Sequence, residues 1–198
     1  MNSALSIEVV NLTRLAVDPA EVTRLLGGVL ESEGVTAGEL GVRFVGARRM
    51  RELNRDYLGH DEVTDVLAFP LEGDEAPPTG VDSLGSAAPS SDGLVLGGPK
   101  PDGADPGDDA DDAGDAGDAG DAATDMPRLL GDVVVCSRRA AAQALAAGTP
   151  LAFEIAMLLV HGTLHVLGYD HERDAGEMAL RQARHLDDAS WEHLLGKA

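Results

Sequence analysis

The sequence predicts an α+β domain in which a small mixed sheet of about four strands packs with about five helices. Short apolar or alternating runs that suit strands are interspersed with longer segments whose apolar residues recur at the helical period of 3.6. A length of 198 residues suits one domain. Only residues 71–127 show neither pattern over a long stretch. We therefore expect a single domain, residues 1–198, that this stretch interrupts.

The N-terminal third predicts a strand, a helix and a second strand. Residues 6–10 are rich in apolar side chains and suit a strand. Asp18 and Pro19 form a typical helix start, with Asp at the N-cap and Pro at the first helical position. The helical period continues to about Glu33, and residues 40–45 then alternate as in a strand.

The next segment predicts a helix with an arginine face, followed by a strand. Residues 47–58 have helical periodicity, and their spacing places Arg48, Arg51 and Arg55 on one face. Residues 63–69 suit a strand, which a proline then ends.

Residues 71–127 carry most of the acidity of the chain. They hold 13 Asp and 2 Glu against one basic residue, Lys100, and so contribute −14 of the formal charge of −20. The segment is rich in Gly, Pro, Ala and Ser and has no aromatic residue. Such a composition buries too little apolar surface to offset the entropy of ordering. We expect a disordered insertion between two strands, either solvated filler or an acidic tether that mimics nucleic acid or holds cations.

Beyond the insertion, the chain predicts one central strand and three helices. Residues 129–136 are apolar enough for a central strand, and they include the single cysteine, Cys136, which suits a buried structural thiol in a reducing compartment. Residues 137–147 and the strongly apolar residues 151–167 suit two helices. A last helix is expected over about residues 175–195.

Three of the six histidines lie in one short run and form a candidate metal site. His161 and His165 are four residues apart, and a step of four on a helix returns to the same face, so both imidazoles can bind one ion. Gly168 can end the helix in a left-handed conformation, after which the chain can bring His171 to that ion. Three neutral nitrogen ligands with a fourth position left to water are typical of catalytic zinc. The alternative is three ordinary core or surface histidines.

The same spacing invites comparison with the metzincin proteases, whose pattern is HExxHxxGxxH. The three histidines and the glycine agree with this pattern. Gly162, however, stands where the protease has the glutamate that takes a proton from metal-activated water. The run therefore predicts metal-assisted hydrolysis of a substrate other than a peptide.

Several segments together resemble the YbeY family of bacterial endoribonucleases. The run HGTLHVLGYDH, from His161 to His171, is similar to the family's HGxLHLxGYDH. The other matching segments are Glu52-Leu53-Asn54 with Tyr57 (family ELNxxY), Thr64 to Pro70 (TDVLSFP), Leu130 to Val133 (LGDI), and Glu177-Met178 with Arg181-Gln182 (EMxxRQ).

This resemblance implies a single-domain α+β protein that holds one Zn²⁺ ion through His161, His165 and His171. It also implies a single-strand-specific endoribonuclease that acts in 3′ maturation of 16S rRNA and in ribosome quality control. The expected partners are single-stranded RNA and the ribosomal small subunit. Some members carry an arginine after the tyrosine that aids catalysis, where this chain has Leu58. The cation that neutralises the phosphate is therefore left open.

Two other functions fit the same residues. One is a metal-dependent hydrolase of another substrate, such as a degenerate metzincin-like protease. The other is a non-catalytic ribosome assembly factor whose zinc is structural. Besides zinc-activated water, the candidate helpers are Asp170, which adjoins a ligand, and Asp132, whose carboxylate in an apolar strand needs a partner such as a loop or a ligand imidazole.

Charge and hydropathy narrow the choice of partners. Because the insertion carries −14, the rest of the chain carries only −6. Arg48, Arg51 and Arg55 can then line an RNA groove, or form a solvated helix face with local ion pairs. No apolar run reaches the ~18–20 residues of a membrane span, and the N-terminus lacks the features of a secretory signal. We expect a cytoplasmic protein with neither a membrane nor DNA as a partner.

Overall fold

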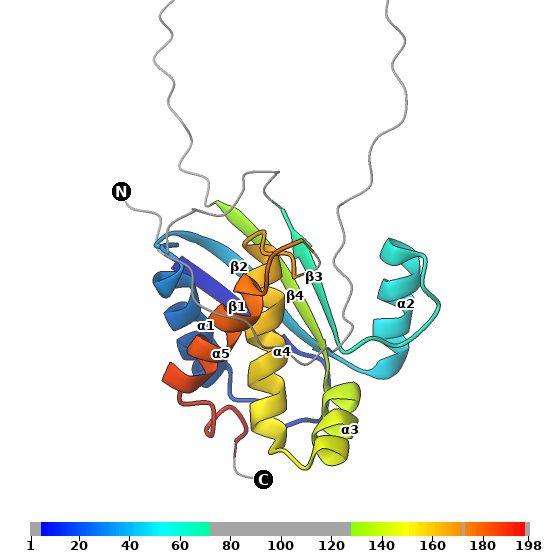
Figure 1. Cartoon of the computed structure of the whole chain (residues 1–198). Helices are drawn as coiled ribbons and strands as arrows, with labels where there is room; N and C mark the ends of the chain where they lie inside the picture. Colours follow the sequence, from blue (N-terminus) through cyan, green and yellow to red (C-terminus); the bar gives the residue numbers. More distant parts are fainter. Residues whose placement is uncertain (1–4, 72–127, 172, 197–198) are drawn as a thin grey trace, which may run out of the picture.

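The computed structural model shows an α+β fold built on one four-stranded sheet in the order β1-β2-β4-β3 (Figure 1). It describes residues 5–71, 128–171 and 173–196. The strands are β1 (Leu5–Asn11), β2 (Gly38–Val45), β3 (Val66–Pro70) and β4 (Leu129–Cys136). β1, β2 and β4 run parallel, whereas β3 pairs antiparallel with β4 at the edge of the sheet. The predicted mixed sheet is confirmed.

Five helices accompany the sheet, as predicted. They are α1 (Pro19–Ser32), α2 (Ala47–Leu58), α3 (Ser137–Ala147), α4 (Leu151–Val166) and α5 (Glu177–Asp188). α1 begins as expected, since the Asp18 carboxylate accepts a hydrogen bond from the backbone N of Ala20 at 2.9 Å. α4 buries 12 of its 16 residues, which is typical of a helix at the centre of a fold.

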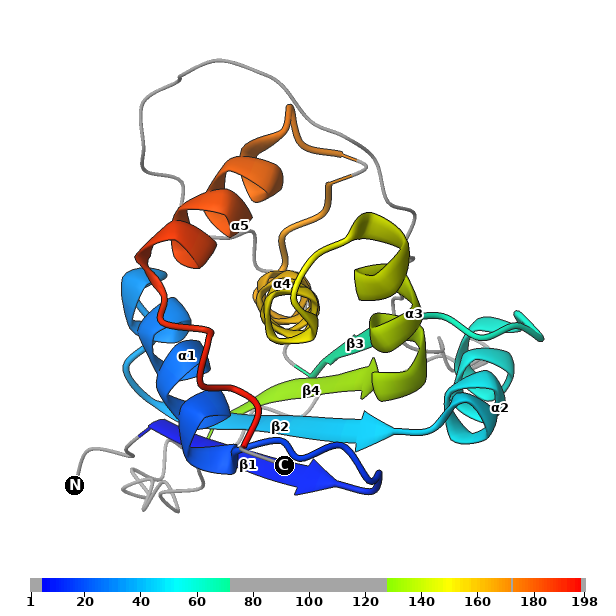
Figure 2. The same cartoon turned by 90° about the horizontal axis from the view of Figure 1, so that it is seen from below.

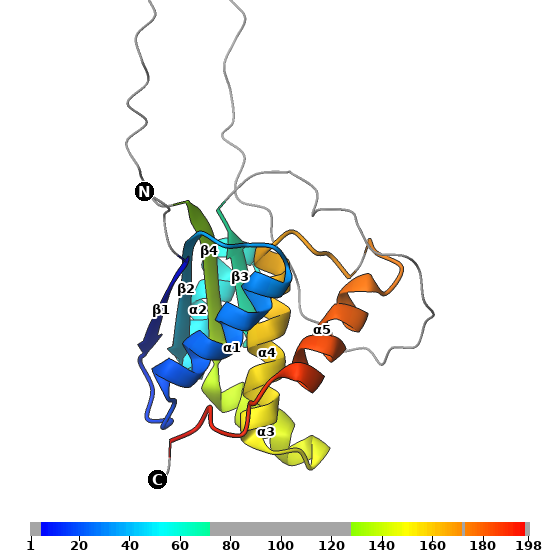
Figure 3. The same ribbon diagram turned by 90° about the vertical axis from the view of Figure 1, so that its left-hand side faces the viewer.

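The helices cover the two faces of the sheet unequally. Figure 3 shows α1, α4 and α5 on one side of the sheet, and Figure 2 shows α4 nearly end-on between α3 and the pair of α1 and α5. Successive side chains of a strand point to opposite faces. Val133 of β4 accordingly packs in the main core with α1 and α4, whereas Val134 packs with Met50 of α2. α2 and α4 therefore lie on opposite faces of the sheet.

The predicted last helix is too long. α5 ends at Asp188, and not near residue 195, because Ala189 is extended with φ −94° and ψ 140°. The chain then returns to the body of the fold, where Leu195 forms a single β-bridge with Val17. The helical pattern continues past Asp188, but pairing with the N-terminal part of the chain replaces the helix there.

The third strand begins later than predicted, at Val66 and not at residue 63. Asp65 holds the approach to the strand in a loop: its carboxylate accepts hydrogen bonds from the backbone N of Val66 at 2.9 Å and from Gln143 Nε2 at 2.6 Å. The backbone carbonyl of Asp65 also accepts a hydrogen bond from the backbone N of Cys136 at 2.7 Å, so contact with β4 begins at this residue.

The acidic insertion joins two neighbouring strands. The backbone N of Leu71 donates to the carbonyl of Leu130 at 3.0 Å, so the chain ends on either side of the insertion lie side by side at the end of β3 and β4. The disorder predicted for residues 71–127 concerns residues that, apart from Leu71, lie outside the described ones.

The structure also bears on the predictions for Cys136 and for membrane-spanning helices. Cys136 is buried and forms no disulfide, in agreement with the expected structural thiol. Among the helices of residues 5–71, 128–171 and 173–196, none has both the length and the apolar character needed to cross a bilayer.

Candidate metal centre

The three histidines of the predicted metal site come together at the C-terminal end of α4. His161 and His165 lie one turn apart on this helix. Gly168 follows the helix with φ +90°, a left-handed conformation that glycine adopts without steric cost. The turn that it forms brings His171 back to the two helical histidines.

The cluster has the dimensions of a metal site. One ligand nitrogen from each histidine lies within 4.8 Å of the other two. The ring centroids of His161 and His165 are 4.5 Å apart, and those of His171 lie 5.5 and 5.2 Å from them. His171 Nδ1 is buried and has no hydrogen-bond partner among the described residues. A buried nitrogen without a partner needs an explanation, and a bound cation supplies one.

Hydrogen bonds on the far side of two rings set their tautomers. His165 Nδ1 donates to the Tyr169 carbonyl at 2.8 Å, and His161 Nδ1 donates to the side-chain oxygen of Gln182 at 2.9 Å. Each Nε2 therefore carries a lone pair, and the two Nε2 atoms face each other at 3.0 Å. Facing lone pairs repel unless a cation binds both, and nitrogen ligands of tetrahedral zinc stand about 3.3 Å apart. The donor set fits a metal ion.

Burial keeps these imidazoles in the neutral form that binds metals. Burial, and after it the charge of the neighbouring His161, lowers the pKa of His165 to about 4. Burial also lowers the pKa of His161, partly offset by the hydrogen bond to Gln182. Because a ligand histidine must be deprotonated, both side chains are ready to bind a cation at neutral pH.

Gly162 faces the sheet and not the histidine cluster. A Cβ atom at this position would lie 2.6 Å from Val133 Cγ1 and 3.1 Å from Val66 Cγ2. α4 therefore packs so closely on β3 and β4 that no side chain fits between them. The glutamate of the metzincin pattern has no room here, which gives a packing reason for the glycine.

Two residues that sequence reasoning missed support the cluster from outside the histidine run. Gln182 of α5 orients His161, and only its place in a segment that resembles the family pointed to it. Glu33, at the end of α1, has a side chain that is 5 % exposed and accepts a hydrogen bond from the Tyr169 hydroxyl at 2.8 Å. Burial and the neighbouring Glu33 carboxylate raise the pKa of Tyr169, so the hydroxyl stays a donor. No local pattern indicated this role for Glu33.

The two candidate helper carboxylates lie in different places. Asp170 adjoins His171 in the turn, pairs with Arg173 at 3.2 Å, and its charge acts on the pKa of His165. Asp132 lies on the α2 side of the sheet, where it packs over Gly41 and approaches Arg43 at 3.6 Å. The structure brings Asp170 to the cluster, whereas the partner of Asp132 is an arginine and not a ligand imidazole.

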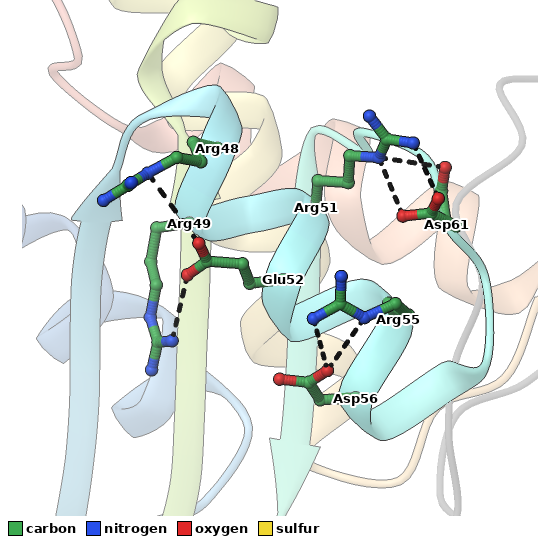
Figure 4. A network of polar contacts seen from close by, with 7 residues as sticks. All are labelled: Arg48, Arg49, Arg51, Glu52, Arg55, Asp56 and Asp61. Carbon is green, nitrogen blue, oxygen red and sulfur yellow. Dashed lines mark hydrogen bonds and ion pairs between the residues drawn. The ribbon is translucent and has the colours of Figure 1, made fainter.

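The predicted arginine face lies on α2, across the sheet from the histidine helix α4. Its arginines, together with the neighbouring Arg49, pair with nearby carboxylates (Figure 4). The pairs are Arg48–Glu52 (3.7 Å), Arg49–Glu52 (3.4 Å), Arg51–Asp61 (2.6 Å) and Arg55–Asp56 (3.0 Å). All four arginines are more than half exposed. Exposed ion pairs contribute little to stability because water screens them, so these arginines can exchange their carboxylates for phosphates.

Comparison with known proteins points to one family. Residues 10–190 match the family model described as Endoribonuclease YbeY. Endoribonuclease YbeY of Salinispora tropica is 37% identical over 190 residues, which cover 94% of this chain and 96% of that protein. The proteins of the same name from Staphylococcus carnosus and Mycobacterium tuberculosis are 36% and 31% identical, over 76% and 93% of this chain and 71% and 83% of theirs.

A solved structure supports the fold. The solution structure of TM1509 from Thermotoga maritima superposes with a TM-score of 0.50 and 18% identity, over 91% of this chain and 87% of that one. At this level of identity the likeness concerns the fold alone.

Proposed function

Because this chain belongs to the endoribonuclease YbeY family, we propose that it is a zinc-dependent nuclease that cleaves single-stranded RNA. We further propose that it acts in the cytoplasm, on the ribosomal small subunit, in 3′ maturation of 16S rRNA and in ribosome quality control. Family membership supports hydrolysis of RNA. The observation that supports the metal is the cluster of His161, His165 and His171, whose ligand nitrogens lie within 4.8 Å of one another.

The residues of the chain can hold a metal and orient its ligands. Three imidazoles supply neutral donors and leave a fourth position, as at catalytic and not structural zinc. A zinc ion held there supplies Lewis acidity toward a phosphate oxygen and lowers the pKa of water. Gln182 and the Tyr169 carbonyl accept the Nδ1 protons of His161 and His165, which directs both Nε2 lone pairs to one point.

The surroundings of the cluster favour a phosphodiester over a peptide as the substrate. A metzincin-like protease needs a glutamate directly after the first histidine, and Gly162 occupies that position against Val133. Asp170 lies beside the cluster and is the candidate for orienting a ligand or moving a proton, whereas Asp132 lies across the sheet. The role of Asp170 is part of the proposal.

We also propose that Arg48, Arg51 and Arg55 contact the RNA backbone. α2 and α4 flank the edge strand β3 from opposite faces, so an RNA strand that contacts both passes over this edge. Changing all three arginines to Gln should weaken RNA binding and reduce the slope of log K against log salt by about 2, because each phosphate contact on a single strand contributes about 0.7. The matched control is the triple Gln variant of three exposed arginines elsewhere, Arg14, Arg24 and Arg184.

An unchanged slope in the α2 variant would move the RNA contact elsewhere. Zinc content should be the same in both triple variants, because no arginine of either set bonds a histidine of the cluster.

The direct test of the function is an RNA cleavage assay. Zinc-loaded protein should cleave a single-stranded RNA, spare the same RNA annealed to its complement, and leave casein intact. A chelator and the variant His165→Ala should each abolish cleavage, and cells depleted of the protein should accumulate 16S rRNA with an extended 3′ end. Chelator-resistant cleavage would contradict the role of the metal. Zinc-loaded protein that binds the small subunit but cleaves no RNA would favour the assembly factor.

A further inference from the structure

Glu33 is a buried carboxylate that joins three distant parts of the chain. Its Oε2 accepts hydrogen bonds from the Tyr169 hydroxyl and from Arg181 Nη1, each at 2.8 Å, and its Oε1 accepts one from His185 Nε2 at 2.7 Å. The side chains of Glu33, Arg181 and His185 are 5, 14 and 8 % exposed. Burial of a carboxylate is costly unless it is paired and hydrogen-bonded, and here both oxygens are paired.

Tyr169 connects Glu33 with the turn that carries His171. Its backbone N donates to the Leu164 carbonyl at 3.1 Å, which closes the turn after α4. Its own carbonyl accepts the Nδ1 proton of His165 at 2.8 Å. Its ring lies under the guanidinium of Arg181, 4.9 Å from the centroid. Tyr169, two positions before His171, is thus held by two backbone hydrogen bonds, by the ring contact with Arg181 and by the hydroxyl bond to Glu33. The ring contact and the hydroxyl bond both lead to Glu33, the first through Arg181 and the second directly.

Arg181 connects Glu33 with the other helical ligand. Arg181 and His185 lie one turn apart on α5, and both donate to Glu33. Gln182, the neighbour of Arg181, accepts the Nδ1 proton of His161. The position and rotation of α5 relative to α1 therefore decide whether Gln182 reaches this imidazole.

We propose that Glu33 is a positioning residue for the metal centre: from the end of α1 it holds the Tyr169 turn and α5 in register, and through them it orients all three histidines. This inference rests on the proposed metal site. Glu33 touches no histidine of the cluster, so it acts through Tyr169, Arg181 and His185. Its removal should loosen ion binding even where the fold survives.

The variant Glu33→Gln tests this role, with Glu31→Gln as its matched control. Gln keeps the volume of Glu33 but replaces an acceptor oxygen with a donor NH₂ that faces other donors. Glu31 lies in the same last turn of α1, is exposed, and loses the same charge. The dissociation constants for Zn²⁺ and Co²⁺ are measured by competition with a chromophoric chelator at 10 °C, with circular dichroism to confirm folding.

We expect Glu33→Gln to raise both dissociation constants about tenfold, the smallest loss of metal affinity that is typical when a residue that supports the ligands is changed. The substitution should also alter the visible absorption of bound Co²⁺. Glu31→Gln should stay within twofold of the wild type. Tyr169→Phe removes only the hydroxyl and should weaken binding at least threefold while the ring still packs under Arg181. This second variant decides the question if Glu33→Gln does not fold.

A purely structural role would lower the melting temperature of Glu33→Gln but leave the metal affinity and the Co²⁺ spectrum of the folded protein unchanged. That result, or Tyr169→Phe within twofold of the wild type when Glu33→Gln is unfolded, would overturn the inference. If the wild type itself bound no Zn²⁺ or Co²⁺, the proposed function would fail first. If the wild type bound zinc and cleaved RNA while the variants matched it, only the positioning role of Glu33 would fail.

Discussion

Replacing Gly162 with Ala tests the packing of α4 on the sheet, on which the exclusion of a protease glutamate depends. The new Cβ would stand 2.6 Å from Val133 Cγ1 and 3.1 Å from Val66 Cγ2, whereas carbon atoms pack at about 3.5–4.0 Å. α4 must therefore retreat by about 1 Å, or the two valines must change rotamer. Overpacking of this kind costs about 1–3 kcal/mol, against a gain of about 1 kcal/mol from the helix propensity of Ala over Gly.

The matched control is Gly28→Ala in the interior of α1. A Cβ at Gly28 meets nothing within 4 Å, so this variant carries the same propensity gain without the clash and should be more stable than the wild type by up to about 1 kcal/mol. The difference between the two variants isolates the clash and should be about 1–3 kcal/mol. Urea denaturation of metal-free protein measures it, because a bound ion would add its own linkage to the stability.

The reasoning is refuted if Gly162→Ala gains as much stability as Gly28→Ala. α4 would then lie farther from β3 and β4 than described, and a side chain at position 162 could be accommodated. The packing argument against a glutamate at this position would fail with it.

Three further predictions follow from individual contacts. His165→Ala should lower the zinc content of the purified protein from about one ion per chain to nearly none by elemental analysis, because two imidazoles remain where catalytic zinc uses three protein ligands; unchanged zinc would refute the ligand assignment. Burial and the charge of Asp65 raise the pKa of Glu154 above its usual 4.5, so ionisation of Glu154 destabilises the folded state as the pH rises. Glu154→Gln should therefore raise the melting temperature at pH 7.5 but not at pH 4, and an equal effect at both values would contradict this. A short Gly-Ser linker in place of residues 72–127 should shift the melting temperature by only a few degrees, since closure entropy changes by about 0.6 kcal/mol per doubling of loop length; a large loss would show that the segment packs on the domain.

Features of the fold that depend on neighbours in sequence could be predicted from the sequence. The helical period, the Asp18 cap and the four-residue step from His161 to His165 each act over one or two turns, and the structure has all three. The end of α5 could not be predicted in this way. Residues after Asp188 keep a helical pattern, but the bridge between Leu195 and Val17 competes with the helix, and that bridge depends on where the N-terminal part of the chain lies.

The arginine face of α2 could be predicted from the sequence, but its position relative to the histidines could not. Helical spacing correctly groups Arg48, Arg51 and Arg55, because only the geometry of α2 is needed. Spacing does not tell on which face of the sheet α2 packs, and the structure places it across the sheet from the histidines. Asp132 lies on the face of the sheet that α2 covers, because successive side chains of β4 point to opposite faces. It therefore points away from α4 and lies next to Arg43.

Glu33 could not be identified for a further reason, which bears on how the metal centre is built. In the sequence it is the last residue of an amphipathic helix, where a glutamate is ordinarily exposed and replaceable. Its partners lie 136 to 152 residues away, and they reach it only because α1 and α5 pack on the same side of the sheet beside α4. The histidine run supplies the ligands locally, whereas their orientation depends on contacts between three helices. Metal affinity should therefore respond to substitutions in α1 and α5 that leave every histidine in place.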